Sequence, residues 1–319
     1  MFILKRKFIS LLAIVSVVGF ASAIASAQLK LPRPSQWASV TQTIGVTDIT
    51  VSYSRPGVKG RAIFGEAPKD VYAKGEATLD DQYKRPEGMV IVPFGHVWRT
   101  GANEATRFVV TDDVMINGQK LAAGKYSLHT IPGKDEWTIV FNGEANQWGS
   151  FDYDPAKDTL RVKAKPQWVT ENQEWMAFSF DPVTDNSAVV NIRWEKARVP
   201  FTVAVDVPAV TLNRARAAVA AAKPDDWRTP LNAAGYAKQV KSDADAAAWI
   251  AQALKAVDAS IASKETFQNL AGKTNILLAL GRKDEAMAVA EKAIERGKAD
   301  KADTTAFEKR VADLKAGKM

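Results

Sequence analysis

The part of the chain before residue 208 alternates hydrophobic and polar residues with the two-residue period of a β-strand. Between Asp48 and Tyr53, isoleucine, valine and tyrosine alternate with aspartate, threonine and serine. Turn residues separate such runs, and Asn117-Gly118 is a dipeptide favoured in tight hairpins. The other runs are Arg107–Thr111, Asp113–Ile116, Gln119–Ala122, Lys125–Ile131, Trp137–Phe141, Thr159–Lys165, Glu174–Phe180, Ala188–Glu195 and Pro200–Val207. Short strands at this spacing predict an antiparallel β-sandwich, with a closed barrel as the alternative.

After Pro208 the hydrophobic pattern takes the period of amphipathic helices, and alanine and charged residues dominate. Seven of the nine tryptophans precede this point, so the composition changes here as well. The predicted helices are Thr211–Ala222, Leu231–Lys241, Asp243–Val257, Lys264–Leu280, Lys283–Arg296 and Thr304–Lys315. Gly281 is placed for a turn between two helices, and Gly297 for a C-terminal cap. The sequence therefore predicts two domains, residues 28–208 and residues 209–319.

One helical segment, Leu270–Ala293, resembles a tetratricopeptide repeat, with hydrophobic residues on its first helix and alanines on its second. A looser copy covers Leu231–Leu254. Hairpins of this kind bury their faces against stacked neighbours and leave an extended surface for a partner. The resemblance implies a helical module that docks a protein partner, and the alternative is a plain helical cap.

The N-terminal residues have the pattern of an export signal. Three cations at residues 5–7 precede an apolar stretch that ends near Ile24, and Ala25-Ser26-Ala27 follows. This pattern predicts a signal peptide over residues 1–27 and a mature chain that starts at Gln28. The alternative is an uncleaved membrane anchor. Cleavage predicts a periplasmic or secreted protein that has no membrane span.

Charge and cysteine content narrow the choice of partners. The formal net charge of +7 falls to +4 when the three cations of residues 5–7 are removed. A mild positive balance without basic runs argues against a nucleic-acid partner. The chain has no cysteine, which excludes disulfides and thiolate chemistry.

Three sequence blocks carry a specific resemblance. They are RPGVKGRAIFG at Arg55–Gly65, VPFGHVWRTGANEAT at Val92–Thr106 and AAGKYSLHTIP at Ala122–Pro132. Together with Trp137–Asn142 and the helical tail around Leu231–Tyr236, they make the chain similar to the bacterial domain of unknown function 2911 family. The resemblance covers nearly all of the mature chain. It implies an exported protein with a β-rich body, and it implies no activity.

Two glycine-punctuated loops contain the candidate chemistry. Arginine side chains suit carboxylate, phosphate or sulfate groups because a guanidinium donates two parallel hydrogen bonds. A glutamate beside an apolar indole can act as an acid or base, and aromatic rings can form a platform for a sugar. The predicted ligand-binding residues are Arg55, Lys59, Arg61, Trp98, Arg99, Asn103 and Tyr126, and the predicted catalytic residues are Glu104 and Arg99.

Each of these roles has a structural alternative. The arginines can hold loop carbonyls or pair with structural carboxylates. Asn103 can adopt a left-handed turn conformation, and the aromatic rings of Trp98, Trp148 and Tyr126 can belong to the core.

Several common catalytic sites are absent from the sequence. His96 and His129 are the only histidines, so a three-histidine zinc site is excluded, and we predict no metal and no cofactor. The triplet that begins at Gly272 resembles the end of a phosphate-binding loop but lacks the earlier glycine, so it is a chance match. Two classes of function are left. The first is a binding protein for a small anionic or carbohydrate ligand. The second is an envelope hydrolase or lyase in which Glu104 is the acid or base.

Overall fold

A computed structural model describes residues 31–66 and 89–318, and the predicted signal peptide and its cleavage site lie outside these residues. The described residues from Ser35 onward form one compact unit. The strands are β1 (Gln36–Ile44), β2 (Thr47–Arg55), β3 (Phe64–Gly65), β4 (Val92–Pro93), β5 (Thr106–Val110), β6 (Val114–Ile116), β7 (Gln119–Leu121), β8 (Gly124–Ile131), β9 (Trp137–Asn142), β10 (Asp158–Ala164), β11 (Gln167–Val183) and β12 (Ser187–Ala204). The helices are α1 (Val207–Ala221), α2 (Arg228–Gln239), α3 (Asp243–Ser263), α4 (Phe267–Ala279), α5 (Lys283–Ala299) and α6 (Thr305–Lys315).

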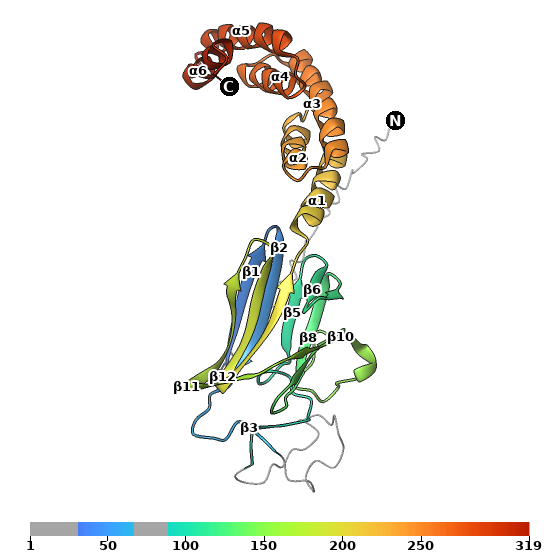
Figure 1. The fold of residues 1–319 in the computed structure, drawn as a ribbon, viewed down its shortest axis with the longest axis vertical. Coiled ribbons are helices and arrows are strands. Elements are labelled where there is room, and N and C mark those ends of the chain that lie inside the picture. The colour runs from blue at the N-terminus through green and yellow to red at the C-terminus, as the bar shows by residue number, and fades with distance from the viewer. Residues whose placement is uncertain (1–30, 67–88, 319) are drawn as a thin grey trace, which may run out of the picture. The chain divides into compact units, whose positions relative to one another are not determined.

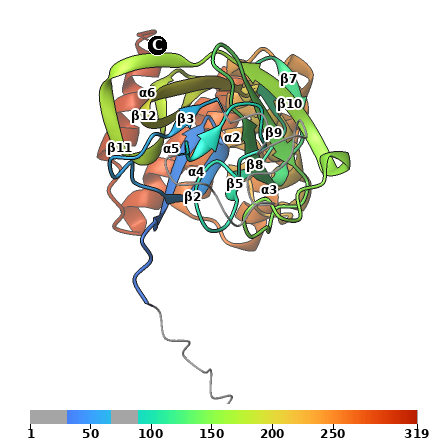
Figure 2. The same cartoon turned by 90° about the horizontal axis from the view of Figure 1, so that it is seen from below.

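Two antiparallel sheets form the β-rich part of the chain, as Figures 1 and 2 show. The six-stranded sheet has the order β1-β2-β5-β8-β9-β10, and the four-stranded sheet has the order β11-β12-β6-β7. The chain leaves the first sheet after β5, forms the β6–β7 hairpin in the second, and returns at β8. Both sheets are open at their ends, so the predicted sandwich is confirmed over the barrel alternative.

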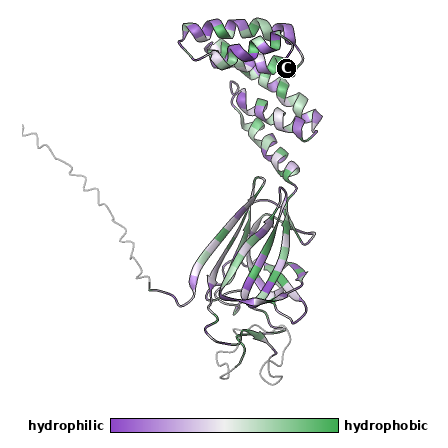
Figure 3. Cartoon of the chain, turned by 60° about the vertical axis from the view of Figure 1, so that its left-hand side comes forward, coloured by the Kyte–Doolittle hydropathy of each residue, from purple (hydrophilic) through white to green (hydrophobic). Residues whose placement is uncertain are grey.

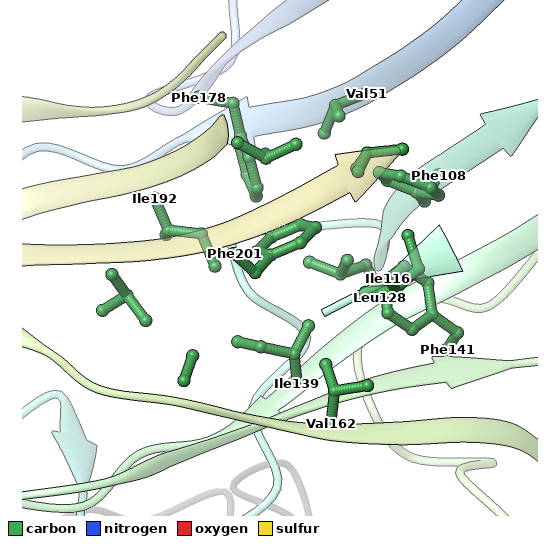
Figure 4. Close-up of a cluster of buried hydrophobic side chains, with 14 of the residues drawn as sticks. Val51, Phe108, Ile116, Leu128, Ile139, Phe141, Val162, Phe178, Ile192 and Phe201 are labelled. Carbon is green, nitrogen blue, oxygen red and sulfur yellow. The ribbon is translucent and has the colours of Figure 1, made fainter. Parts of the chain in front are cut away.

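The core lies between the two sheets. Figure 4 shows Phe108, Leu128 and Phe141 from the six-stranded sheet pointing toward Ile116 and Phe201 from the four-stranded sheet. Hydrophobic and hydrophilic residues alternate along the strands (Figure 3), because successive side chains of a strand point to opposite faces. The alternate residues of the six-stranded sheet therefore form a second face outside the core, which we call the outer face.

Several strands differ from the prediction: β3 and β4 were not expected, and β11 extends beyond the run Glu174–Phe180 at both ends. The run Ala188–Glu195 and the first part of the run Pro200–Val207, expected to be separate, form the single strand β12, which ends at Ala204. Proline has no N–H group to donate to a neighbouring strand, so it is rare inside a sheet. The strand tolerates Pro200 because this residue lies between its two ladders, since β12 pairs with β11 up to Arg198 and with β6 from Val203. Strand β1 was not predicted at all.

The change from strands to helices comes at the predicted position, although α1 begins earlier than expected. Its N-cap is Asp206, whose side chain accepts a hydrogen bond from the backbone N–H of Ala209 at 3.1 Å. Pro208 lies in the first turn, where its missing N–H has no intrahelical partner to lose. The predicted start was too late because the alanine-rich pattern begins after residue 210, whereas the residues that cap the helix precede it.

The remaining helices pack as neighbours in sequence, α2 with α3 and α4 with α5. Gly281 occupies the turn between α4 and α5 with a φ of 74°, as predicted. Gly297 is not a cap, because α5 continues to Ala299. It is buried, and a Cβ atom there would collide with the side chain of Thr304, so its role is close packing. The tetratricopeptide character of these hairpins stays a prediction.

No helix among the described residues is both long enough and apolar enough to cross a membrane.

Candidate functional site

The first candidate loop uses its arginines to hold backbone carbonyls. Arg61 donates from Nε to the carbonyl of Val58 at 3.1 Å and from Nη2 to the carbonyl of Gly57 at 2.6 Å. Arg55 donates from Nε to the carbonyl of Met176 in β11 at 2.8 Å. These contacts match the structural alternative, since the guanidinium groups fasten the loop to itself and to the four-stranded sheet.

Lys59 lies at the surface of the same loop. Its backbone N–H donates to Oε1 of Glu174 at 2.9 Å, and its φ of 51° is left-handed. Its Nζ is 5.8 Å from the centroid of the Trp175 ring, a cation–π distance. The loop thus places its one exposed ammonium against β11.

Two of the candidate aromatic residues belong to the core. Trp98 is 3% exposed and stacks on Trp194 with ring centroids 5.6 Å apart. The ring of Tyr126 is also buried, its hydroxyl donates to the carbonyl of Ala122 at 2.9 Å, and burial raises its pKa. Neither ring presents a face to a ligand, so the prediction of a platform built on Trp98 and Tyr126 is not supported by this geometry.

The second candidate loop is anchored at its start. Trp98 and Thr130 exchange two backbone hydrogen bonds, of 2.8 and 2.9 Å, which fasten the loop to β8. The hydroxyl of Thr106 donates to the carbonyl of Thr100 at 2.6 Å and closes the loop on itself. Arg99, between these anchors, is half-buried.

Asn103 joins this loop to the outer face. Its φ of 59° is left-handed, as the structural alternative expects. Its Nδ2 also donates to Oγ of Ser54 in β2 at 3.2 Å and to the carbonyl of Ser35 at 3.3 Å. The turn is therefore held against β2 by the amide of Asn103.

Glu104 lies beside an exposed tryptophan from another part of the chain. Glu104 forms an isolated antiparallel bridge with Trp148, and the N–H of Gly149 donates to the carbonyl of Asn103 at 2.9 Å. Because paired residues of an antiparallel bridge project to the same side, the glutamate and the indole are neighbours. The side chain of Trp148 is 56% exposed.

A second exposed tryptophan lies on the opposite flank of Asn103. Trp37 in β1 is 49% exposed and pairs with Ser54, whose hydroxyl accepts the bond from Asn103. Residues directly opposite in a sheet have Cβ atoms about 5 Å apart. We call the surface made by Trp37, Asn103, Glu104 and Trp148, which lies over the buried Ser54, the Trp37–Trp148 face.

A buried polar network supports this face from below. Gln147, next to Trp148, donates from Nε2 to Oγ of Ser127 and to Oδ1 of Asn142, both at 3.2 Å. Nε2 of His129 lies 3.2 Å from the same Ser127 hydroxyl, and His129, Ser127 and Asn142 have no exposed surface. The loop between β9 and β10 thus covers the outer face of β8 and β9, and it holds Trp148 in place.

The network ends in an ion pair. Nε of Arg161 and the hydroxyl of Tyr153 both donate to Oδ2 of Asp158 at 2.7 Å. Burial, together with this hydrogen bond to the carboxylate, raises the pKa of Tyr153 well above the ordinary tyrosine value. Tyr153 is therefore a neutral hydrogen-bond donor, and its ring lies 4.9 Å from that of His129.

The predicted site residues separate into two groups. Arg55 and Lys59 lie against β11 and Arg61 against its own loop, whereas Asn103 and Glu104 lie against β2 and the loop around Trp148. Within residues 31–66 and 89–318, no group of histidine, aspartate and glutamate side chains is arranged to hold a metal ion. His96 and His129 are both buried.

Sequence reasoning missed Trp37 and Gln147. The residues from Gln36 to Ile44 do alternate, with serine and threonine at every second position, and this pattern predicts a strand that exposes Trp37. Nothing in the sequence around Gln147 indicates that its amide is buried.

The fold and this face define a β-sandwich protein that continues into a helical region. A family model described as a protein of unknown function, DUF2911, matches residues 35–203. The chain belongs to this family, and the matched residues run from the start of β1 almost to the end of β12. Searches of curated proteins and of solved structures found no match.

Proposed function

We propose that the protein is an exported binding protein and that it holds a carbohydrate ligand on the Trp37–Trp148 face. The observation that carries the proposal is the position of Asn103 and Glu104 between two tryptophans that are each about half exposed. Sugar rings stack on exposed indole faces, and their hydroxyl groups need amide and carboxylate partners nearby.

The chemistry of the surrounding surface favours a sugar over a small anion. The guanidinium group of Arg55 donates to a carbonyl of β11 and that of Arg61 to carbonyls of its own loop, so both lie away from the Trp37–Trp148 face. On the outer face beside Trp37, the hydroxyl groups of Ser39 and Ser52 are 2.9 Å apart. Indole rings and hydroxyl groups beside the amide of Asn103 and the carboxylate of Glu104 match the mixed polarity of an oligosaccharide.

The rigid support of Trp148 also favours binding. Its neighbour Gln147 makes three hydrogen bonds from Nε2, to Ser127, Asn142 and the carbonyl of Glu144. An aromatic side chain held in place before the ligand arrives loses little conformational freedom on binding. The predicted signal peptide agrees with such a role, because it would bring the face into contact with extracellular glycans.

The test is thermal unfolding of the purified chain with hexasaccharides of glucose, N-acetylglucosamine and mannose. A ligand at 100 times its Kd stabilises a single site by about 2.7 kcal/mol. We expect one of these sugars to raise the unfolding temperature, and we expect Trp148→Ala and Trp37→Ala each to abolish the shift. Trp168→Ala is the matched control, because this side chain is 44% exposed but lies on the four-stranded sheet.

The proposal fails if no sugar stabilises the chain, or if Trp168→Ala removes the shift as completely as Trp148→Ala. The Glu104→Gln variant separates binding from the hydrolase or lyase alternative. Loss of sugar cleavage in this variant, with the thermal shift retained, assigns Glu104 as acid or base. A thermal shift without cleavage in the unmodified chain supports a binding protein.

A further inference from the structure

The free edge of β1 is a second feature of the fold that points to a partner. An edge strand exposes a row of N–H and C=O groups, and natural sheets block such rows with short strands, charges, prolines or bulges. Among the described residues, β1 pairs only with β2, and it ends the six-stranded sheet.

The other three edges of the two antiparallel sheets carry these protective features. Strand β7 has only three residues. Strand β10 contains a bulge and two cations, and the side chain of Asn117 donates to the carbonyl of Lys163 at its edge. Strand β11 contains three register shifts, and the segment around Gly57 pairs with it.

Strand β1 has none of these protective features. Its nine residues, QWASVTQTI, include no charged residue and no proline. The register with β2 runs without a break from Gln36 to Ile44. A regular, uncharged edge of this length is a template for another strand.

The direction of the free backbone groups follows from the neighbouring strands. The carbonyl of Asp48 in β2 accepts a hydrogen bond from Thr111 on the β5 side, so Asp48 does not bond to its β1 partner Thr43. Because bonded pairs alternate along an antiparallel ladder, the N–H and C=O groups of Ser39 and Thr41 also point outward, away from β2. Among the residues that the structure describes, only the carbonyl of Thr43 on this edge accepts a hydrogen bond, from the side-chain amide of Gln42 at 2.9 Å.

We propose that a second copy of this chain covers this edge, with β1 pairing antiparallel to β1 of its partner about a two-fold axis at Val40. A hydroxyl residue lies on each side of Val40, and β1 contains no charged residue, so self-pairing brings no like charges together. In this register Ser39 lies opposite Thr41 of the second copy, and the two six-stranded sheets become one.

The existing sheet shows that the resulting side-chain pairs are compatible. Between β1 and β2, the hydroxyl groups of Thr41 and Thr50 already lie 2.8 Å apart on the outer face. Pairing of Ser39 with Thr41 across the axis repeats this contact. A single strand pair buries less than a standard protein interface, so the dimer is concentration-dependent.

A pair of charge variants tests the interface. Ser39→Lys with Thr41→Lys places like charges opposite each other across the axis, whereas Ser39→Lys with Thr41→Glu places opposite charges there. Both variants lose the same hydroxyl groups, so the second is a matched control for the first. We expect sedimentation of the full exported chain to show a dimer for the unmodified protein and for the lysine–glutamate variant, and a monomer for the double-lysine variant.

A cysteine variant tests the register. The chain contains no cysteine, so Val40→Cys introduces a single thiol at the proposed axis. Opposite residues of a non-bonded pair have Cα atoms about 4.5 Å apart, within the span of a disulfide. We expect Val40→Cys to form a covalent dimer about tenfold faster or more than Lys163→Cys on β10, because pairing holds its thiols at millimolar effective concentration.

A monomer at every concentration of the unmodified chain, with equal cross-linking rates for the two cysteine variants, would overturn the proposal. The proposal would also be overturned if the double-lysine variant formed dimers as strongly as the unmodified chain. Circular dichroism of each variant confirms that it is folded before its mass is interpreted.

Discussion

Asn142 is the residue whose removal tests the buried network most directly, because its amide makes four hydrogen bonds. Nδ2 donates to the carbonyl of Asp154 at 2.9 Å and to Oδ1 of Asp158 at 2.8 Å. Oδ1 accepts from the N–H of Glu144 at 3.0 Å and from Nε2 of Gln147 at 3.2 Å. The side chain has no exposed surface. We therefore predict a large loss of stability for Asn142→Ala.

The magnitude follows from these bonds. A neutral hydrogen bond contributes about 1 kcal/mol to stability, and a bond to a charged group contributes about 1.5–3 kcal/mol. Three neutral bonds and one bond to the carboxylate of Asp158 set an upper value of about 6 kcal/mol. Water that enters the space left by the amide restores some of these bonds. We expect a net loss of about 3 kcal/mol, a large fraction of a typical domain's stability.

The assay is urea unfolding followed by tryptophan fluorescence, which reports mainly on the sandwich because seven of the nine tryptophans lie before residue 208. Asn146→Ala is the matched control. It removes the same side chain from the same loop, but its amide oxygen accepts a single exposed bond, from Arg107 at 2.6 Å. We expect the control to lose at most about 0.5 kcal/mol. Equal unfolding midpoints for Asn142→Ala and Asn146→Ala would refute the assignment of a stabilising role to the network.

Two further predictions concern the helical region and the ion pair. A Cβ at Gly272 would collide with the ring of Trp227, so Gly272→Ala should lower stability by about 1–3 kcal/mol. Gly235→Ala, where the space is open, should be neutral or stabilising by up to about 1 kcal/mol, and helical circular dichroism during thermal unfolding distinguishes the two variants. The raised pKa of Tyr153 means that the folded state keeps a proton which the unfolded state releases above pH about 10, so stability falls as pH rises through this range. Tyr153→Phe lacks this dependence, so urea unfolding from pH 8 to 11 should show the advantage of the unmodified chain over the variant shrinking. A constant difference would contradict the raised pKa of Tyr153.

The polar network has a direct consequence for the proposed site. The loop that contains Trp148 is held by the same amide that Asn142→Ala removes. The indole is not part of the core, so its position depends on the bonds beneath it. We therefore expect any sugar affinity of the chain to weaken in Asn142→Ala even at temperatures where the fold persists.

Local patterns in the sequence determine the elements of this fold. Alternation between Asp48 and Tyr53 produces β2, and Asn117-Gly118 produces the turn between β6 and β7, because these preferences act within a few residues. Gly281 likewise marks the turn between α4 and α5. The same reasoning failed at Gly297, where a distant side chain, and not the helix end, requires a glycine.

The roles of the loop residues depend on contacts between distant parts of the chain. Trp98 and Trp148 both lie in irregular segments without a period, yet one is 3% exposed and the other 56% exposed. Arg55 donates to a carbonyl 121 residues later in the sequence, which no local pattern indicates. Strand periodicity determines which face a residue takes within its own element. Which loops meet, and which side chains they leave exposed, follows from the packing of the two sheets, because that packing joins residues that have no local relation.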